Sequence, residues 1–270
     1  MRGLLQEGKG TPIIALHGWL DNAGSFDLLC RSLTHRTILA LDLAGHGRSD
    51  HRHLTSDYSI WKDVAEVSQV ISQLGWSKVI LLGHSRGAAI TTLSAAVLGD
   101  TVEAVIWVDG GFPMLEQDDF VSQLKKSVDH QLRERRPKRV FRSKDQAIAA
   151  RLRSHFKLTR DQVEQLMVRG IVQHELGYSW SSDPRLMDAS PVRLNNAQMN
   201  DALQAITAPI LLLFAEDESE TMTQWRNKLR ALEGIESKGY VGEHHLHMDV
   251  KTAAMMAADI EDWLKRSTTS

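Results

Sequence analysis

The segment Gly83-His84-Ser85-Arg86-Gly87 carries the side chain best suited to covalent chemistry in this chain. It directly follows the apolar run from Val79 to Leu82 and opens a small-residue stretch that predicts a helix from 87 to 98. A sharp turn from a buried strand into a helix strains the backbone at its serine and exposes the hydroxyl, and side chains in place of the flanking glycines would collide with the neighbouring elements. The spacing therefore predicts that Ser85 is a nucleophile rather than only a helix cap.

A serine hydroxyl is a weak nucleophile, so Ser85 needs a general base and a carboxylate that orients the base, in the chain order serine, acid, histidine. Two aspartates follow predicted strands in the right interval: Asp217 after the run from 210 to 214, and Asp109 after the run from 102 to 108. Acids at the carboxyl ends of parallel strands face the ligand crevice of a sheet. We expect Asp217 to be the acid, with Asp109 as the alternative.

The general base is expected in the segment from Gly242 to His247, because this segment follows the last predicted strand and so lies over the same edge of the sheet. Three histidines compete for the role: His244, His245 and His247. A metal site is another use for such side chains, since His-x-His occurs at 51 and 53 and again at 245 and 247. No nearby carboxylate or cysteine spacing completes a known zinc pattern, so we expect no metal and no cofactor.

Two backbone N–H groups are expected to stabilise the negative oxygen of a tetrahedral intermediate. One belongs to Arg86, which follows the nucleophile, and the other to Trp19 in the segment His17-Gly18-Trp19, after a buried strand. We therefore expect Trp19 and Arg86 to form an oxyanion hole.

The elements that must position these residues alternate along the chain. Apolar runs at 13–16, 37–43, 78–83, 102–109 and 208–217 predict buried strands, and the spacing of apolar residues from 60 to 74 predicts a helix that ends at Gly75. Such alternation indicates an α/β fold with a mostly parallel sheet covered by helices. Residues 113–191 interrupt this order and read as several amphipathic helices, so we expect them to be an insertion whose charges and small apolar face suit a lid that opens.

A basic stretch lies inside this insertion. Between residues 125 and 142 the chain has eight Lys or Arg residues but only two acids, Asp129 and Glu134. An anion-binding surface is one interpretation, but a solvated helix face is the preferred one, because the stretch has almost no aromatic residues for nucleic-acid binding.

Composition narrows the class of protein. The chain has 270 residues, 42% hydrophobic and 24% charged residues, and a formal net charge of −2, which excludes a disordered chain and gives no overall field for nucleic acid. Cys30 is the only cysteine, and no apolar run is long enough to span a membrane. We expect a cytoplasmic protein with a small-molecule substrate, no nucleic-acid partner and no membrane span.

The chain resembles the α/β-hydrolase superfamily over nearly its whole length. The resemblance is carried by His17-Gly18, the segment DLAGHGRS at 42–49, the serine motif and the final histidine cluster. A closer resemblance to the serine hydrolase-like protein subfamily is carried by HGWLDNAGSF at 17–26, GYSW at 177–180 with DPRL at 183–186, and HHLH at 244–247. It implies an α/β-hydrolase fold with about eight strands, a core of residues 1–112 and 192–270, and a helical cap of residues 113–191.

The resemblance also implies roles for single residues. Superfamily members commonly have a histidine followed five residues later by an acid, which superposes His244 and Asp249 on that pair and favours His244 over His245. The chain departs from the pattern at Glu243 and at Arg86, whose side chain would shape the pocket or pair with an acid. It also has room for one strand ahead of the core, where relatives have two.

The function implied is a serine esterase that cleaves small or medium carboxylic esters through an acyl-enzyme. Lactonase, thioesterase, perhydrolase and carbon–carbon hydrolase reactions use the same catalytic residues. A binding protein or receptor that holds a small ligand without cleaving it is the alternative from another class.

Overall fold

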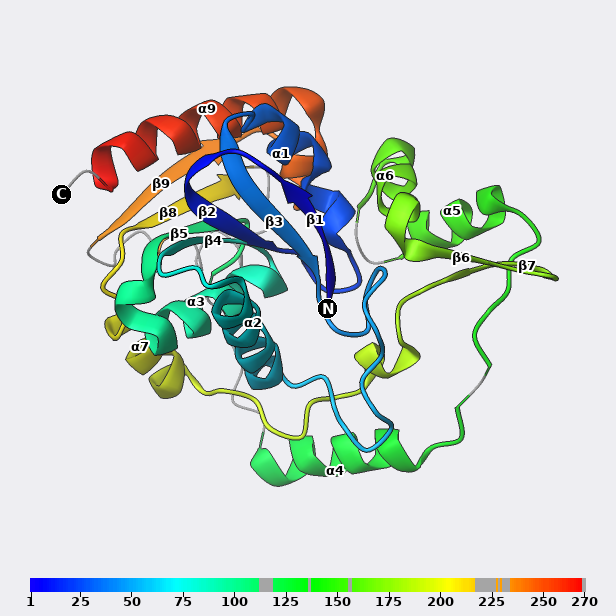
Figure 1. Ribbon diagram of the computed structural model, residues 1–270. Helices are drawn as coiled ribbons and strands as arrows, with labels where there is room; N and C mark the ends of the chain where they lie inside the picture. Colours follow the sequence, from blue (N-terminus) through cyan, green and yellow to red (C-terminus); the bar gives the residue numbers. More distant parts are fainter. Residues whose placement is uncertain are drawn as a thin grey trace.

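The computed structural model describes residues 1–111, 119–135, 137–154, 157–216, 227, 229 and 234–268. A mostly parallel sheet forms its centre, as predicted, with the strand order β1-β3-β2-β4-β5-β8-β9 (Figure 1). Its strands are β1 (Arg2–Gln6), β2 (Lys9–Leu16), β3 (Arg36–Asp42), β4 (Val79–His84), β5 (Val102–Val108), β8 (Ile210–Ala215) and β9 (Ile235–Tyr240). Only β1 runs antiparallel to its neighbour, β3, among these strands.

The number of strands is close to the expected one. The described residues form a seven-stranded sheet, whereas about eight strands were expected. One strand, β1, precedes β2, as the sequence led us to expect.

Helices cover both faces of the sheet. Successive side chains of a strand point to opposite faces, and both sets are apolar here, so both faces must be covered. In β2, Ile13 and Ala15 pack in a core with α1 (Asp27–Ser32) and α9 (Val250–Ser267). Ile14 and Leu16 pack in a second core with α2 (Ile60–Leu74) and α3 (Arg86–Leu98). The described helices include none that is long and apolar enough to span a membrane.

Strand register brings three loops to one edge of the sheet. Leu16 in β2 pairs with Gly83 in β4, and Gly83 pairs with Trp107 in β5. The residues that follow these strands therefore leave the sheet side by side, so that the loops that begin at His17, Ser85 and Asp109 meet although they are far apart in sequence.

The inserted segment, which we define as the described residues between 119 and 191, contains more than helices. It holds α4 (Phe120–Leu132), α5 (Lys144–Leu152), α6 (Arg160–Gly170), the strands β6 (Ile171–His174) and β7 (Gly177–Trp180), and the short helix η3 (Pro184–Met187). The antiparallel β6–β7 hairpin was not predicted, because strands of four residues are too short to display a clear alternation. The predicted junction at 112 and 113 lies outside the described residues. After the insertion, α7 (Asn196–Gln204) leads back to β8.

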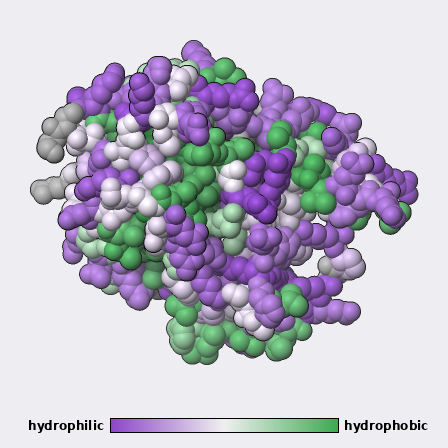
Figure 2. Space-filling model, in the orientation of Figure 1, coloured by the Kyte–Doolittle hydropathy of each residue, from purple (hydrophilic) through white to green (hydrophobic). Residues whose placement is uncertain are grey.

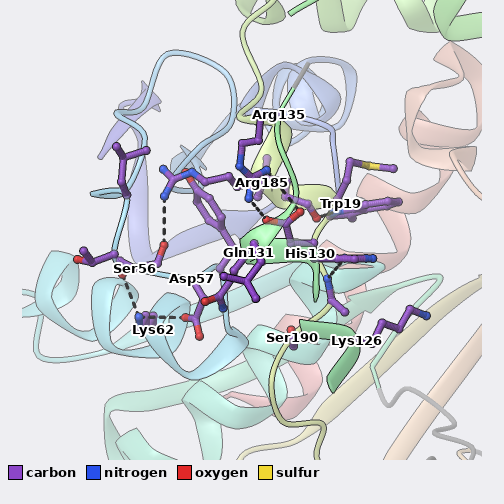
Figure 3. Close-up of a pocket in the computed structure, with 18 of the residues that line it drawn as sticks. Trp19, Ser56, Asp57, Lys62, Lys126, His130, Gln131, Arg135, Arg185 and Ser190 are labelled. Atoms are coloured by element: carbon purple, nitrogen blue, oxygen red, sulfur yellow. Dashed lines mark hydrogen bonds and ion pairs between the residues drawn. The ribbon is translucent and has the colours of Figure 1, made fainter. Parts of the chain in front are cut away.

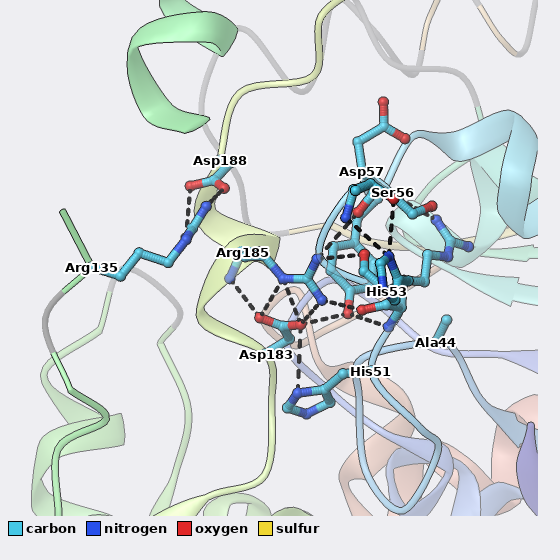
Figure 4. Close-up of polar contacts among 12 residues, drawn as sticks. Ala44, His51, His53, Ser56, Asp57, Arg135, Asp183, Arg185 and Asp188 are labelled. Atoms are coloured by element: carbon cyan, nitrogen blue, oxygen red, sulfur yellow. Dashed lines mark hydrogen bonds and ion pairs between the residues drawn. The ribbon is translucent and has the colours of Figure 1, made fainter. Parts of the chain in front are cut away.

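Buried polar contacts join α6 and η3 to the core. The Arg169 guanidinium lies 2.5 Å from the Asp42 carboxylate, and both side chains are buried. At η3, Asp183 accepts a hydrogen bond of 2.7 Å from the Tyr58 hydroxyl and pairs with Arg185 at 2.7 Å (Figure 4). Opening of a lid, as expected from the sequence, would have to break these contacts.

Candidate active site

Ser85 occupies the turn between β4 and α3 that the sequence predicts. Its backbone has φ 51° and ψ −115°, a conformation that non-glycine residues rarely adopt. The flanking glycines are required sterically: a Cβ atom on Gly87 would lie 1.9 Å from the Leu16 carbonyl oxygen, and one on Gly83 would lie 2.5 Å from the Ala88 nitrogen. The tight contact of β4, α3 and β2 therefore determines the residue types around Ser85.

Unusual backbone conformations gather at this edge of the sheet. In the described part of the chain, the non-glycine residues with positive φ are Leu20, Ser85 and Asp109. They follow β2, β4 and β5 respectively, in the three loops that the strand register brings together. Such conformations cost about 1–3 kcal/mol each and persist where the surroundings enforce them, often at functional sites. The strained backbone conformations thus lie at the same edge of the sheet as the candidate catalytic side chains.

Asp109 is the acid that contacts a histidine. Its Oδ2 atom lies 2.6 Å from His244 Nδ1, and its Oδ1 accepts a hydrogen bond of 3.1 Å from the Ala215 backbone N–H. Burial by itself would raise the pKa of Asp109, but the hydrogen bond and charge of His244, with the Ala215 N–H, lower it below its usual value. Asp109 is therefore buried but favours its ionised form, and an ionised carboxylate is the partner that His244 needs as a base.

This contact favours Asp109, which the sequence ranked second to Asp217. Asp217, the first choice, lies outside the described residues, so the structure gives no contact for it. Asp109, the alternative, is followed by Gly110, whose backbone packs against Ser85. A Cβ atom on Gly110 would lie 2.8 Å from both the nitrogen and the oxygen of Ser85, so the backbone after Asp109 packs directly on the serine.

Of the three competing histidines, His244 is the one that pairs with Asp109. Its side chain is 30% exposed, so the ring can reach a substrate, whereas His245 and His247 are buried. His84 Nε2 lies 3.0 Å from the His244 carbonyl oxygen, and because a carbonyl only accepts, that nitrogen carries the proton. The residue before Ser85 thus holds the backbone of His244 in place.

The two expected oxyanion donors lie at the start of α3 and after β2. Arg86 is the first residue of α3, where a backbone N–H has no partner within the helix. Trp19 follows Gly18, and its indole Nε1 donates a 3.0 Å hydrogen bond to the Leu186 carbonyl of the inserted segment. The Arg86 guanidinium lies 2.5 Å from Asp63 Oδ2, so its side chain both lines a pocket and pairs with an acid.

A buried polar cluster beside the site was missed by sequence reasoning. Asp21 Oδ2 lies 3.1 Å from His245 Nε2 and 3.6 Å from His84 Nδ1, and Arg151 of α5 lies 3.1 Å from Asp21 Oδ1. Burial alone would raise the pKa of Asp21, but His245 and His84 hold it well below its usual value. Burial lowers the pKa of His84 to about 4. Asp21 lies within the HGWLD segment, yet no spacing linked it to His245.

Asp21, His84 and His245 also form the set of described side chains whose ligand atoms, all within 4.8 Å of one another, are placed to hold a metal ion. The Arg151 guanidinium contacts the same carboxylate, and its positive charge opposes a bound cation. The two His-x-His pairs do not converge: His51 contacts the Ser181 carbonyl, while the His53 ring contacts Thr55.

Comparisons with known proteins agree with this architecture. A sequence model of the alpha/beta hydrolase fold family matches residues 11–235. A serine hydrolase-like protein of Dictyostelium discoideum is 28% identical over 89% of this chain and 72% of its own length. A serine hydrolase-like protein of Danio rerio is 26% identical over 95% of this chain and 82% of its own length. These relatives carry the subfamily name that the sequence resemblance predicted.

Solved structures extend the similarity to three dimensions. The crystal structure of a hypothetical protein from Pseudomonas aeruginosa PAO1 superposes with a TM-score of 0.89 and 35% identity, covering 98% of this chain and 95% of that chain. A thioesterase domain from the curacin biosynthetic pathway superposes with a TM-score of 0.81 and 22% identity, covering 97% and 99%. The second likeness concerns the fold alone.

Proposed function

Because this chain belongs to the α/β-hydrolase fold family, we propose that it is a serine hydrolase that cleaves carboxylic esters with Ser85, His244 and Asp109. The observation that carries the proposal is the 2.6 Å contact between Asp109 Oδ2 and His244 Nδ1, because a histidine held in this way presents its other ring nitrogen as a base. The names of the curated relatives support a hydrolase. The ester substrate and the residue roles are our inference.

In the first step, Ser85 Oγ attacks the ester carbonyl while His244 Nε2 accepts the hydroxyl proton. The buried Asp109 carboxylate stabilises the positive imidazolium that forms and keeps its Nδ1 proton in place. The backbone N–H groups of Trp19 and Arg86 are proposed to bind the negative oxygen of the tetrahedral intermediate. His244 then gives its proton to the leaving alcohol, and an acyl-Ser85 remains.

In the second step, water attacks the acyl group, with His244 as the base that removes a water proton and returns it to Ser85. The carboxylic acid leaves and the enzyme is restored. The inserted segment would serve as the cap over this chemistry, since Trp19 already contacts it through Leu186. Lactones and thioesters present the same carbonyl to the same residues.

A fluorophosphonate probe and p-nitrophenyl butyrate test the proposal together. We expect the native protein to be labelled and to release p-nitrophenol, and Ser85→Ala to lose both properties, because the covalent bond forms at this hydroxyl. Ser72→Ala, an exposed serine on α2, is the matched control and keeps both. If the folded native protein neither reacts with the probe nor cleaves the ester, the esterase proposal fails and the alternative of a binding protein is favoured.

A further inference from the structure

A large polar cavity begins beside the proposed oxyanion hole. It has a volume of about 940 Å³ and lies between the core and the inserted segment. Trp19, which is labelled in Figure 3, and Arg86 line the cavity, and Arg86 directly follows Ser85 in the chain. Its other walls come from the loop at 54–58, from α4 and from residues 185–193.

Cations outnumber acids in the lining of this cavity. Its described lining residues include two acids, Asp57 and Asp188, but six lysines and arginines. We call these six residues the basic pocket: Lys62, Arg86, Lys126, Arg135, Arg185 and Arg193. Lys126 and Arg135 belong to the basic stretch at 125–142, and the other four come from separate parts of the chain.

Acidic partners hold several of these cations in fixed positions. Lys62 Nζ lies 2.9 Å from Asp57, and Arg185 lies 2.7 Å from Asp183. Arg135 pairs with Asp188 in the same way. A cation that is already oriented loses little freedom when it binds an anion. The pairs therefore prepare the pocket for a ligand while the lining keeps more cations than acids.

Lys126 is the cation on α4 that faces this cavity. The described residues provide it with no ion pair, and its side chain is exposed to solvent. His130, one turn later, lines the same cavity, whereas the apolar residues Val121 and Val128 are exposed and do not line it. Figure 2 shows apolar side chains gathered over α4 at the lower edge of the molecule. The helix thus turns polar and basic residues toward the cavity.

Apolar residues, among them Leu54, Leu132 and Leu186, also line the cavity, but they do not enclose it. Leu54 is 83% exposed and Leu132 is 79% exposed, so neither offers a closed apolar wall. Carboxylates and phosphates, by contrast, accept charge-assisted hydrogen bonds from guanidinium and ammonium groups. A cavity with more cations than acids also raises the local concentration of anionic ligands.

We propose that the basic pocket binds an anionic group of the substrate, and that the substrate is an ester or thioester with a carboxylate or phosphate away from the scissile bond. This inference rests on the proposed function, because it places the reacting carbonyl at Ser85. It also gives the basic stretch on α4 a role, since Lys126 is one of its residues.

Two matched pairs of substrates test the proposal and distinguish the position of the anion. p-Nitrophenyl hydrogen adipate against p-nitrophenyl hexanoate tests a carboxylate at the end of the acyl group. Butyryl-coenzyme A against the butyryl thioester of N-acetylcysteamine tests phosphates on the leaving group. We expect kcat/KM for the anionic member to exceed that of its neutral partner by about tenfold in at least one pair. The preference should shrink when NaCl rises from about 50 to about 500 mM.

Two charge reversals on α4 provide the matched variants. Lys126→Glu should reduce the anionic-to-neutral ratio of kcat/KM by about tenfold or more, because a cation of the pocket becomes an acid. Lys125→Glu changes the net charge equally at the neighbouring exposed residue, which does not line the cavity, and should keep the ratio within about twofold of the native value.

The proposal is overturned if neither anionic substrate is preferred, or if the two reversals change the ratio equally. In those cases a native protein that still reacts with the fluorophosphonate probe retains the proposed esterase function. Loss of probe labelling and of turnover with every substrate would instead reject the proposed function, and the anion site with it.

Discussion

At the scale of single residues, the hydrogen bond from His244 to Asp109 determines how the histidine can act. The Asp109 carboxylate is buried, and its two oxygens contact His244 and the Ala215 N–H. An ionised carboxylate in this position favours the tautomer of His244 that has its proton on Nδ1. The positive φ of Asp109, 43°, aims the side chain from the end of β5 toward the C-terminal loop.

Replacement of Asp109 by Asn tests this role directly. The amide keeps the shape of the carboxylate but cannot stabilise the imidazolium, so we expect Asp109→Asn to lower kcat by about 10⁴-fold, as the same change does in a chymotrypsin-type triad. Asp217→Asn is the parallel variant and should keep kcat near the native value. We would measure kcat for ester hydrolysis by both variants and check their folding by circular dichroism. If Asp217→Asn is the crippled enzyme instead, our choice of acid is wrong.

At the scale of elements, one ion pair holds α6 of the inserted segment on the core. Asp42 ends β3 and is fully buried, and it accepts hydrogen bonds from the backbone N–H groups of Ala23 and Arg48. The Arg169 guanidinium also contacts the Asp42 carboxylate, and the Arg169 side chain is only 5% exposed. Removing one partner of a buried pair leaves an uncompensated charge, which costs far more than loss of an exposed pair.

Arg169→Met should therefore lower the free energy of unfolding by about 3 kcal/mol, because the buried Asp42 loses its cation. Urea denaturation followed by fluorescence measures the change. Arg160→Met on the same helix removes an exposed arginine that contacts Asp145 and Glu164, and it should leave stability nearly unchanged. Equal effects of the two variants would mean that the buried pair does not anchor α6. The double variant Arg169→Met with Asp42→Asn should recover part of the loss.

At the scale of the whole molecule, buried histidines link stability to pH. Burial lowers the pKa values of His17, His46, His84 and His247 below the ordinary value. A histidine with a lowered folded-state pKa stays neutral in the folded protein while the unfolded chain binds a proton. Its contribution is complete above the unfolded value of about 6.5 and is lost as the pH falls toward the folded value.

We expect the free energy of unfolding to fall steadily from pH 6.5 to pH 4. His84, with a folded pKa of about 4, accounts for about 3 kcal/mol of this loss. Urea titrations at several pH values measure the slope. His247→Phe should reduce the slope, because neither ring nitrogen of His247 has a hydrogen-bond partner among the described residues and the ring packs beside Phe26. A slope that is flat in the native protein, or unchanged in the variant, contradicts this account.

Local patterns in the sequence were sufficient for the elements around the nucleophile. The apolar run before Gly83 predicts β4, and the small residues after Gly87 predict α3. Gly75 ends α2 as predicted, and its φ is 66°. Each of these features depends on residues that are neighbours in the chain, because side-chain alternation and glycine's backbone freedom act over a few residues. The sequence by itself therefore determined the α/β class and the place of Ser85.

The tertiary structure decided which distant groups meet. Asp109 and Asp217 both follow predicted strands, and only the path of the C-terminal loop brings His244 to within 2.6 Å of Asp109. The Asp21 cluster and the basic pocket likewise join residues more than a hundred positions apart. Spacing along a chain carries no information on such contacts, because they depend on how several loops close over one edge of the sheet.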